Sequence, residues 1–332
     1  MKKPVKLLLA LVGVVAAALL VVSFYLTYKI TTSRNNQSVE TQIVEIKSGS
    51  SIGDIARQLA DKKLIDSTVA FEFYARFGPA RGRLLPGPYA LSANMSIKKI
   101  VEKLAAGDLA VAKITVPEGV TVNRIARLWV ASGAGNEADF KAALKLDYGY
   151  DFLKDRMNPS SLEGYLAPAT YQVGYQAKPR ELIEKMLLQF EKTVRPVLYG
   201  ANESGLSPAQ VLTLASIVEA EANNTVDRKL VAGIFLNRLE QGIKLQSDVT
   251  VNYVTGKTAT RPEDLLVDSR YNTYIYKGLT PGPINNPSLN AIEAVLRPTR
   301  TDYLFFIAGK DGKMYYARTN DEHEANIDRY LK

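Results

Sequence analysis

The hydrophobic pattern begins with a long uncharged run and later breaks into short segments with strand or helix periodicity. Residues 7–28 carry no charged side chain and end in FYLTY, which places aromatic rings at the depth of a membrane interface. A helix of this length reaches about 33 Å, close to the thickness of a bilayer core. No small-x-small cleavage site precedes a polar start, so the pattern favours a retained single-span anchor over a cleaved signal peptide.

The charges beside this run predict its orientation. Lys2, Lys3 and Lys6 lie on its short N-terminal side. Because basic residues are retained on the cytoplasmic side of a membrane span, residues 1–6 are predicted to stay in the cytoplasm and the bulk of the chain to lie outside it. Residues 29–42 are polar and are interpreted as a linker between the anchor and the rest of the chain.

Beyond the linker the pattern predicts an α+β fold. Residues 43–65 have the pattern of a short strand, a serine-capped turn and a helix with one apolar face. The segment IKSGSSIGDIAR at 46–57 aligns with VPEGVTVNRIAR at 116–127, and two copies are too few for a solenoid. They indicate two small α+β units or one duplicated motif. Without regular strand–helix alternation, a parallel α/β sheet is disfavoured.

Later segments complete this prediction. Helices are expected at about 179–198, 207–222 and 226–242, with the last two forming a helical hairpin. Residues 301–319 alternate apolar and polar positions around Gly-Lys-Asp-Gly, which is typical of a β-hairpin.

Two carboxylates interrupt the apolar segment LASIVEAEANN at 214–224. On an α-helix, residues two apart point about 200° away from each other, so Glu219 and Glu221 cannot share a face. The apolar stripe that continues to Glu221 consists of Leu214, Ile217 and Val218. Glu221 is therefore a carboxylate at a position where the pattern calls for an apolar residue.

This placement has two interpretations. A carboxyl on an apolar face has its charged form desolvated, which raises its pKa and allows it to donate a proton near neutral pH. Asn223, Asn224 and Thr225 then end the helix, which would leave the Glu221 carboxyl at the mouth of a cleft. Alternatively, Glu221 forms a structural ion pair with Arg228 or Arg238 on the next helix.

Charge and composition exclude several function classes. The net charge is +8, yet residues 1–34 hold five Lys/Arg and no acid, which leaves 37 basic against 34 acidic residues in the rest of the chain. Most of the basicity is thus a topology signal, and nucleic acid is not an expected partner. The absence of cysteine excludes disulfides and thiolate metal sites. The single histidine, His323, excludes an HExxH zinc site and is expected at the surface or in a supporting role.

Polar and aromatic residues also gather in turn-like segments. Tyrosine rings with amide and carboxyl groups are typical of a sugar-binding cleft, although each such residue also occurs as loop packing. The members of this set are Glu163, Tyr165, Gln246, Asp248, Tyr271, Asn272, Tyr274 and Asn320.

Seven blocks of the sequence occur in a characteristic order. They are VEIKSGSSIGDIARQL, LPGPYAL followed by MSIKKIVEKL, LEGYLAPATY, LASIVEAEA, VAGIFLNRLEQGIKLQSDVTVNY, YNTY and GLTPGPINNP. With these blocks the chain resembles the YceG-like family of endolytic murein transglycosylases from about residue 43 to its C-terminus, behind a similar N-terminal anchor.

The resemblance implies a LysM-like α+β subdomain at residues 43–112 and an α+β catalytic domain at 113–332, whose helical hairpin carries the catalytic glutamate. The second glutamate of the family's I-V-E-x-E block falls on Glu221. The residues expected to bind substrate are Glu163, Tyr165, Glu219, Gln246, Asp248, Tyr271, Asn272 and Asn320. Where the family usually has an aromatic residue and an acid, this chain has Ala167 and Ala169, so the contacts of that segment are less well defined.

The reaction implied by the resemblance is cleavage of the β-1,4 bond between N-acetylmuramic acid and N-acetylglucosamine in nascent peptidoglycan strands. The substrate's own C6 hydroxyl attacks C1 and leaves a 1,6-anhydro end, so that one glutamate serves as acid and then as base, and no metal or cofactor is implied. The implied location is the bacterial cell (inner) membrane, beside membrane-embedded peptidoglycan synthases, where cutting would end strand elongation.

Two alternatives remain open on the sequence alone. A hydrolytic muramidase needs a second carboxylate, for which Asp248 is the candidate. A membrane-tethered peptidoglycan-binding protein without turnover would need neither Asp248 nor Glu221 as a reactive group.

Overall fold

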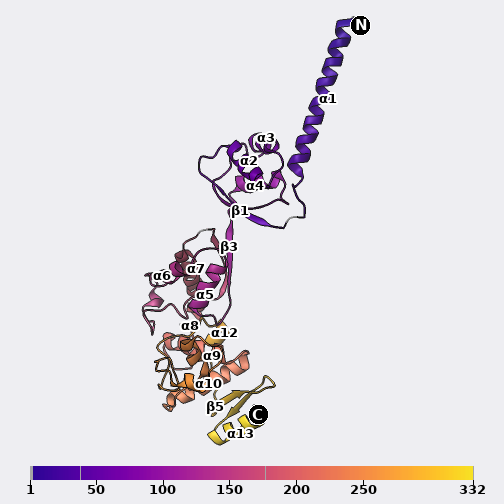
Figure 1. Ribbon diagram of the computed structural model, residues 1–332. Coiled ribbons are helices and arrows are strands. Elements are labelled where there is room, and N and C mark those ends of the chain that lie inside the picture. Colours follow the sequence, from indigo (N-terminus) through magenta and orange to yellow (C-terminus); the bar gives the residue numbers. More distant parts are fainter. Residues whose placement is uncertain (1–2, 38, 176, 332) are drawn as a thin grey trace. The chain divides into compact units, whose positions relative to one another are not determined.

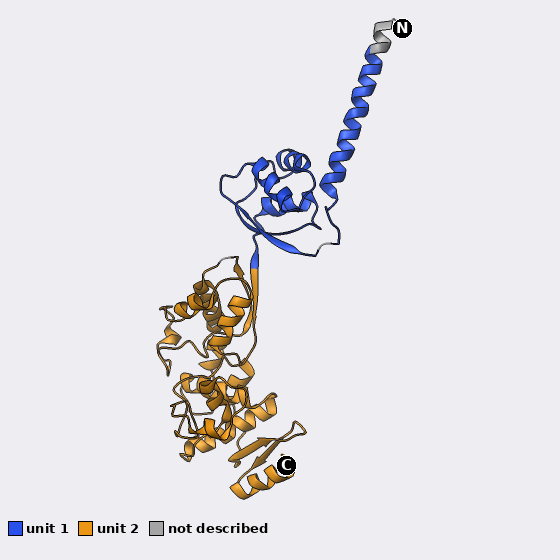
Figure 2. Cartoon of the chain, viewed as in Figure 1, with its two compact units in different colours: residues 1–111 blue, residues 112–332 orange. Residues whose placement is uncertain are grey.

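Figure 1 shows the computed structural model, which describes residues 3–37, 39–175 and 177–331. Helices and short strands both occur, and this mixed content agrees with the α+β prediction. The chain divides into two units, residues 1–111 and residues 112–332 (Figure 2).

The first element is helix α1 (Lys3–Thr31). Among the described residues, Leu8–Thr31 is the one segment long and apolar enough to cross a membrane, with a mean hydropathy of 2.6. Leu20, Phe24 and other apolar side chains before its last turns are exposed, whereas Ile30 is buried in the core of unit 1. An apolar helix whose side chains are exposed over most of its length is typical of a membrane span. The helix continues past Tyr28, where the apolar run of the sequence ends.

Unit 1 also contains an antiparallel strand pair and helices that share one core. Strand β1 (Thr41–Ile46) pairs with β2 (Gly87–Ser92), with Thr41 opposite Ser92 and Ile46 opposite Gly87. The helices are α2 (Ile52–Asp61), α3 (Thr68–Phe77) and α4 (Ile97–Ala106).

Local chemistry sets the ends of these helices, as the sequence pattern predicts. The Ser51 hydroxyl accepts a hydrogen bond from the Asp54 backbone N–H, and the Asp54 carboxylate accepts one from the Ser51 N–H, so that α2 begins with a capping box. Helix α4 ends at Gly107, whose φ of +67° is in the left-handed region that glycine adopts at little steric cost.

The first part of unit 2 joins a strand pair to a helical layer. Strand β3 (Val111–Val116) pairs with β4 (Ala169–Gly174). The helices here are α5 (Val122–Ala131), α6 (Glu137–Ala143), the short turn η1 (Asp151–Leu153), α7 (Pro179–Gln189), the π-helical turn η2 (Phe190–Val194) and α8 (Arg195–Leu198). The helix predicted over residues 179–198 is thus confirmed, with a π turn inside it.

The second part of unit 2 contains the predicted helical hairpin and β-hairpin. Its elements are α9 (Pro208–Glu221), α10 (Thr225–Glu240), α11 (Asp248–Thr255), the turn η3 (Pro262–Leu266), α12 (Leu289–Leu296), β5 (Phe305–Ala308), β6 (Met314–Ala317) and α13 (Asn320–Tyr330). Strands β5 and β6 are antiparallel, with Phe305 opposite Ala317.

Helix α9 is the centre of this part, and its burial corrects one sequence argument. Every residue from Val211 to Val218 is buried, including the polar Thr213 and Ser216, because α10, α11 and α12 all pack against the helix. A single apolar stripe therefore does not distinguish Glu221 from Glu219. The two glutamates differ in their neighbours, and those come from other elements.

Candidate active site

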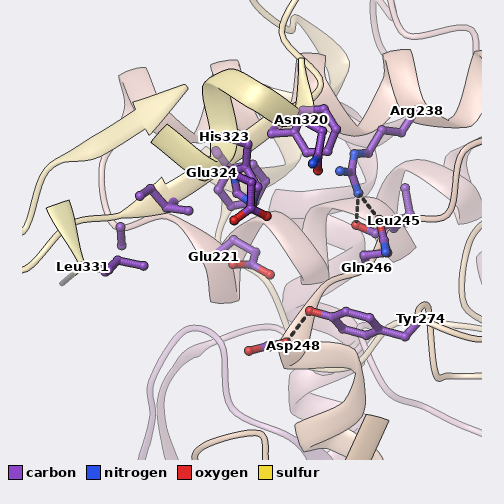
Figure 3. Close-up of a pocket in the computed structure, with 14 residues that line it drawn as sticks. Glu221, Arg238, Leu245, Gln246, Asp248, Tyr274, Asn320, His323, Glu324 and Leu331 are labelled. Atoms are coloured by element: carbon purple, nitrogen blue, oxygen red, sulfur yellow. Dashed lines mark hydrogen bonds between the residues drawn. The ribbon is translucent and has the colours of Figure 1, made fainter. Parts of the chain in front are cut away.

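A cavity of about 460 Å³ opens at the C-terminal end of α9, a volume within the range of small-ligand sites (Figure 3). One side is formed by residues on or near α9, α10 and α11, and the other side by β5 and α13. The lining residues are Glu221, Arg238, Leu245, Gln246, Asp248, Tyr274, Phe305, Phe306, Ile307, Ala308, Asn320, His323, Glu324 and Leu331.

The local sequence places Glu221 at this cavity. It is the last residue of α9, and Ala222 leaves the helix with an extended backbone, φ −137° and ψ 138°. The Asn224 side chain then accepts hydrogen bonds from the backbone N–H groups of Val226 and Asp227 and so begins α10. The Ala-Asn-Asn segment thus ends one helix and starts the next, and the Glu221 side chain projects from the junction.

The surroundings of Glu221 favour its protonated form. Burial raises the pKa of the Glu221 carboxyl to about 7, and the negative charge of Asp248 adds to the rise. The Ser247 hydroxyl donates a hydrogen bond to Glu221 Oε1 at 2.5 Å, which lowers the pKa in part. Among the described residues no Lys, Arg or His forms an ion pair with Glu221.

Ser247 is the N-cap residue of α11, and its hydroxyl is used in an unusual way. In most N-caps this oxygen accepts a hydrogen bond from the helix backbone. Here Ser247 makes no side-chain cap bond, and its hydroxyl points to Glu221 instead. The start of α11 thereby holds the carboxyl. The sequence alone does not point to Ser247, since a lone serine at a helix start has the pattern of an ordinary cap.

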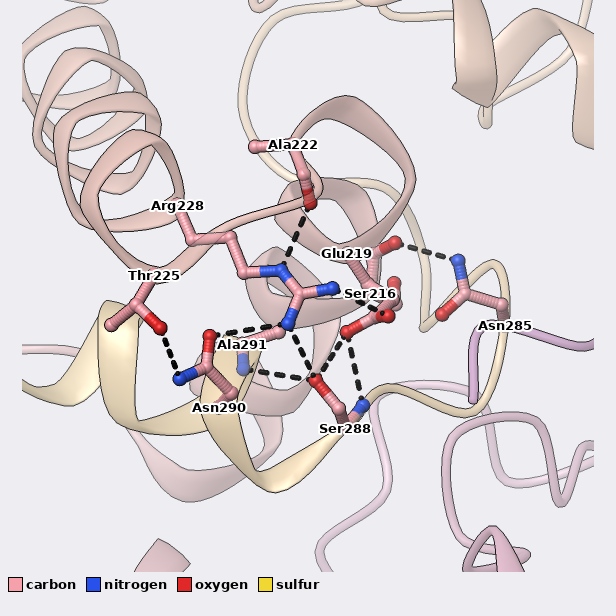
Figure 4. A network of polar contacts seen from close by, with 9 residues as sticks. All are labelled: Ser216, Glu219, Ala222, Thr225, Arg228, Asn285, Ser288, Asn290 and Ala291. Carbon is pink, nitrogen blue, oxygen red and sulfur yellow. Dashed lines mark hydrogen bonds and ion pairs between the residues drawn. The ribbon is translucent and has the colours of Figure 1, made fainter. Parts of the chain in front are cut away.

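Glu219 lies in a different environment, shown in Figure 4. The guanidinium of Arg228 pairs with Glu219 Oε1 at 2.8 Å, and the Ser288 hydroxyl and backbone N–H donate to Oε2 at 2.5 and 3.1 Å. Arg228 also donates to the Ala222 carbonyl at 2.9 Å and to Asn290 Oδ1 at 3.1 Å. The Glu219 carboxylate therefore pairs with a cation and links α9, α10 and the start of α12. Glu219 does not line the cavity.

These contacts test the ion-pair interpretation of Glu221. Arg228, one proposed partner, pairs with Glu219. Arg238, the other, is buried and directs its guanidinium to the carbonyls of Lys244, Leu245 and Leu304. The structural ion pair to Glu221 is thus not formed in the described part of the chain.

The floor of the cavity contains Asp248 and Gln246. The Tyr274 hydroxyl donates to Asp248 Oδ1 at 2.6 Å. Gln246 has a φ of +49°, a left-handed conformation that is strained for a residue other than glycine. Arg238 Nη1 donates to Gln246 Oε1 at 3.4 Å. Two of the predicted binding residues therefore lie beside Glu221, with Tyr274 next to them.

The opposite side of the cavity comes from the C-terminal hairpin and helix. Asn320, a predicted binding residue, lies there with His323 and Glu324. The His323 ring stacks on Phe305 with 5.1 Å between ring centroids and 26° between planes, and the Arg238 guanidinium lies 4.9 Å from the centroid of the same ring. The sequence alone does not place His323 and Glu324 at this cavity, because α13 is a polar helix with no apolar face to orient it.

Glu163 is buried away from the cavity lining, at the start of α5. Its carboxylate accepts hydrogen bonds from the Val122 backbone N–H at 2.9 Å and from the Asn286 side chain at 3.1 Å. Burial raises the pKa of Glu163 to about 8. These bonds connect Glu163 to the start of α5 and to a loop that is distant in sequence.

The remaining predicted residues also lie outside the cavity lining. Tyr165 is buried, and its ring packs against the rings of Phe152 and Phe190. The Asn272 side chain is buried and donates at 2.9 Å to the Leu265 and Val267 carbonyls, which closes a loop.

Tyr271 is likewise engaged by the protein. Its ring lies 5.1 Å from that of Tyr253, and its hydroxyl accepts a bond from Asn158. Of the nine predicted site residues, the structure brings together Glu221, Gln246, Asp248 and Asn320 at one cavity.

This cavity holds a carboxyl with a pKa near neutrality beside amide, hydroxyl and aromatic groups, which are the groups that general acid–base chemistry requires. The chain belongs to the YceG-like family, whose model matches residues 44–329.

Curated relatives and a solved structure are similar to most of the chain. The endolytic murein transglycosylase of Bacillus subtilis (strain 168) is 35% identical over 311 residues, which cover 89% of this chain and 86% of that protein. The protein of the same name from Streptococcus pneumoniae serotype 2 (strain D39) is 32% identical over 87% of this chain, which spans just 58% of its length. A crystal structure of a YceG-like protein from Listeria monocytogenes is 37% identical, with a TM-score of 0.57 over 86% of this chain and 99% of the other.

Proposed function

We propose that this chain is an endolytic murein transglycosylase that cleaves the β-1,4 bond between N-acetylmuramic acid and N-acetylglucosamine within glycan strands. The observation that carries the proposal is Glu221, a carboxyl at a cavity with a pKa of about 7 and no cationic partner among the described residues. Membership of the YceG-like family and the shared name of the curated relatives support it.

The first step of the proposed reaction uses Glu221 as an acid. Its protonated carboxyl gives a proton to the glycosidic oxygen, and the bond between that oxygen and C1 of N-acetylmuramic acid breaks with the electron pair passing to the oxygen. Positive charge develops at C1 and the ring oxygen, as in other glycosidic cleavages. A pKa near neutrality suits this role, because a large fraction of Glu221 still carries its proton at pH 7.

The second step uses the resulting Glu221 carboxylate as a base. It takes the proton of the substrate's C6 hydroxyl while O6 forms a bond to C1, which closes a 1,6-anhydro ring and restores the protonated carboxyl. No water is consumed, and the two products together contain the atoms of the substrate. The Ser247 hydroxyl at 2.5 Å stabilises the carboxylate between the two steps.

The rest of the chain suits work on strands close to a membrane. In this proposal residues 7–28 anchor the protein in the bacterial cell membrane, residues 1–6 stay in the cytoplasm, and residues 43–112 form a LysM-like subdomain that holds glycan. The catalytic domain at 113–332 then acts outside the cytoplasm on nascent strands made by membrane-embedded synthases and ends their elongation. The exposed apolar side chains of α1 support the anchor.

A second candidate function is hydrolysis of the same bond. Asp248 lies in the cavity near Glu221 and accepts a hydrogen bond from Tyr274, so it is available to orient water or stabilise the developing charge. A hydrolase needs such a second carboxylate, and its products carry reducing ends.

The test is a digest of purified peptidoglycan and of uncrosslinked glycan strands by the full-length protein in detergent. Mass spectrometry separates anhydro ends from reducing ends, which differ by one water. Anhydro products that disappear with Glu221→Gln support the transglycosylase. Reducing ends that disappear with Asp248→Asn support the hydrolase, and intact strands with a folded, glycan-binding protein support the third possibility, a binding protein without turnover.

A further inference from the structure

Unit 1 carries a row of apolar side chains on the outer face of α3, which we call the α3 stripe. Val69, Phe73 and Phe77 follow one another at intervals of four residues, so their side chains lie along one side of the helix. Their exposed fractions are 68%, 45% and 69%, whereas Phe71 and Ala75 on the inner face are buried. The Phe73 and Phe77 rings lie 5.3 Å apart. Large apolar side chains gathered on a surface mark a contact with another body.

The packing of α1 shows where unit 1 lies along the proposed membrane span. Leu26 packs against the core of unit 1, and Ile30 is buried in it. These two residues flank Tyr28, at which the uncharged run of α1 ends. In a helix that spans a bilayer, this point lies at the interface between acyl chains and headgroups. Unit 1 therefore packs on α1 at the depth of that interface.

Polar contacts hold the start of α3 at the same level. Helix α1 packs against both α3 and α4. Asp66, which directly precedes the N-cap of α3, pairs with Lys29 at 3.7 Å and with Arg34 at 3.2 Å, and Arg34 also donates to the Ile65 carbonyl at 3.2 Å. Lys29 is the first charged residue after the span. Within unit 1, α3 and β1 lie on opposite sides (Figure 1). The α3 stripe thus begins one helical turn from the point where α1 leaves the bilayer.

The charges around the α3 stripe suit an anionic lipid surface. From Phe73 to Val101 the chain has five Lys/Arg and no Asp or Glu. Three of them, Arg76, Arg81 and Arg83, are exposed at the end of α3 and in the turn after it, and none of the three forms an ion pair within the described part of the chain. Phenylalanines on one face with arginines beside them are typical of helices that lie in a membrane interface.

We infer that the α3 stripe is a second membrane contact of this protein. Val69, Phe73 and Phe77 insert at the boundary between headgroups and acyl chains, and the neighbouring arginines contact lipid phosphates. A bilayer is the occupant that fits, because α1 already brings it to the start of α3 and because an anionic surface matches the unpaired cations. The inference goes beyond the proposed reaction at Glu221, and it rests on the membrane anchor of the proposed function. Two attachments would fix the orientation of unit 1 on the bilayer.

The depth of α3 in a bilayer can be measured by site-directed labelling. The chain contains no cysteine, so a single introduced cysteine takes a fluorescent NBD label selectively. Phe77→Cys puts the label on the α3 stripe. Glu45→Cys is the matched control, at an exposed position of β1 that faces away from the buried Val44. Each full-length variant is reconstituted into phosphatidylcholine vesicles with or without phosphatidylglycerol, and flotation tests its insertion.

In vesicles with phosphatidylglycerol, we expect the label of Phe77→Cys to emit at shorter wavelength than the label of Glu45→Cys. A lipid nitroxide near the headgroup should quench it more than one at the bilayer centre, because an interfacial helix lies about 5–10 Å deep. The combined change of Arg76, Arg81 and Arg83 to Gln should reduce the quenching to its level in phosphatidylcholine alone. About 1 M salt should do the same, since it shortens the Debye length to about 3 Å.

A further variant separates lipid contact from packing within unit 1. Phe73→Ser in the labelled Phe77→Cys chain should weaken the quenching and leave the melting temperature in detergent unchanged, because the Phe73 side chain is half exposed and lies outside the core of unit 1. A role in packing predicts a lower melting temperature with unchanged quenching, and that result would overturn the inference.

Equal emission and quenching of the labels in Phe77→Cys and Glu45→Cys would also overturn it, since the α3 stripe would then face water and be left for a partner protein. Self-quenching that grows with the ratio of protein to lipid would assign the stripe to a second copy of the chain instead. A chain that does not float with the vesicles would overturn the anchor together with the inference. The proposed reaction is tested separately, by the end groups of digested glycan strands.

Discussion

Glu219 and Glu221 lie two residues apart at the end of α9, yet they belong to two different regions of the molecule. Glu219 is part of an ion-pair network with Arg228 and Ser288, in which every carboxylate oxygen has a donor (Figure 4). Glu221 faces a cavity, with the neutral Ser247 hydroxyl as its donor and the negative Asp248 nearby (Figure 3).

The comparison shows how a buried carboxyl acquires a structural or a chemical role. A buried charge is stabilised by an opposite charge, or it becomes neutral through a shift of its pKa. Glu219 follows the first route. Glu221 follows the second, and burial raises its pKa to about 7. The missing cation at Glu221 is therefore the feature that fits this carboxyl for the proposed proton transfer.

The largest effect is expected from Glu221→Gln. An amide of the same shape cannot give or take the proton, so cleavage should fall by about a thousandfold, within the range of general acid–base contributions. Release of anhydro ends from purified strands, followed by mass spectrometry, measures the loss. Retention of more than a tenth of the wild-type rate would contradict the assignment of Glu221 as the acid.

Next in size is the effect of removing the partner of Glu219. Arg228→Met leaves the buried Glu219 carboxylate without its cation, which should lower the free energy of unfolding by about 3 kcal/mol. Urea denaturation followed by circular dichroism measures it. The matched control is the double variant with Glu219→Gln, which should recover part of the loss because no charge is left unpaired. An Arg228→Met protein as stable as wild type would show that the network contributes little.

The pH dependence of stability should report the raised pKa of Glu221. The folded-state pKa of Glu221, about 7, lies above the ordinary 4.5, so the folded state binds more protons between these values. The contribution of Glu221 to the free energy of unfolding is therefore most favourable below about pH 4.5 and declines as the pH rises to about 7.

Denaturation of wild type and Glu221→Gln across this range isolates the contribution, since Glu163 and other groups are common to both proteins. The rate of cleavage should also fall above about pH 7, as Glu221 loses its proton. A difference between the two proteins that does not change with pH would argue against a raised pKa.

The smallest expected effects are two shifts, in opposite directions, of the pH at which the cleavage rate falls. Asp248→Asn removes a negative charge that raises the pKa of Glu221, so the alkaline limb of the rate profile should move to lower pH. Ser247→Ala removes a hydrogen bond to the carboxylate, so the limb should move to higher pH. Each shift should be less than about one pH unit. Shifts in the same direction would contradict this account of the site's electrostatics.

Much of the local structure follows from the sequence. The serine-capped turn within residues 43–65 and the hairpin at residues 301–319 depend on groups a few residues apart, and the structure confirms both. The left-handed stop at Gly107 is another feature of this local kind. The helix boundary after Glu221 is of the same kind, since Asn224 caps the next helix. Periodicity did not distinguish the two glutamates of α9, because a helix that is buried on every side has no polar face to locate.

What the sequence determined by itself, then, is the apolar α1, the order of helices and hairpins, and a glutamate at the end of α9. These features follow from hydrophobicity and hydrogen bonds over a few residues. Only the tertiary structure decided which glutamate has its carboxylate paired with donors from the protein, since Ser288, which bonds to Glu219, lies 69 residues away in the sequence. It also decided that Glu221 and His323 line one cavity, because β5 packs against α10 through contacts between Phe235 and Phe306 and between Arg238 and Leu304 that no local pattern records.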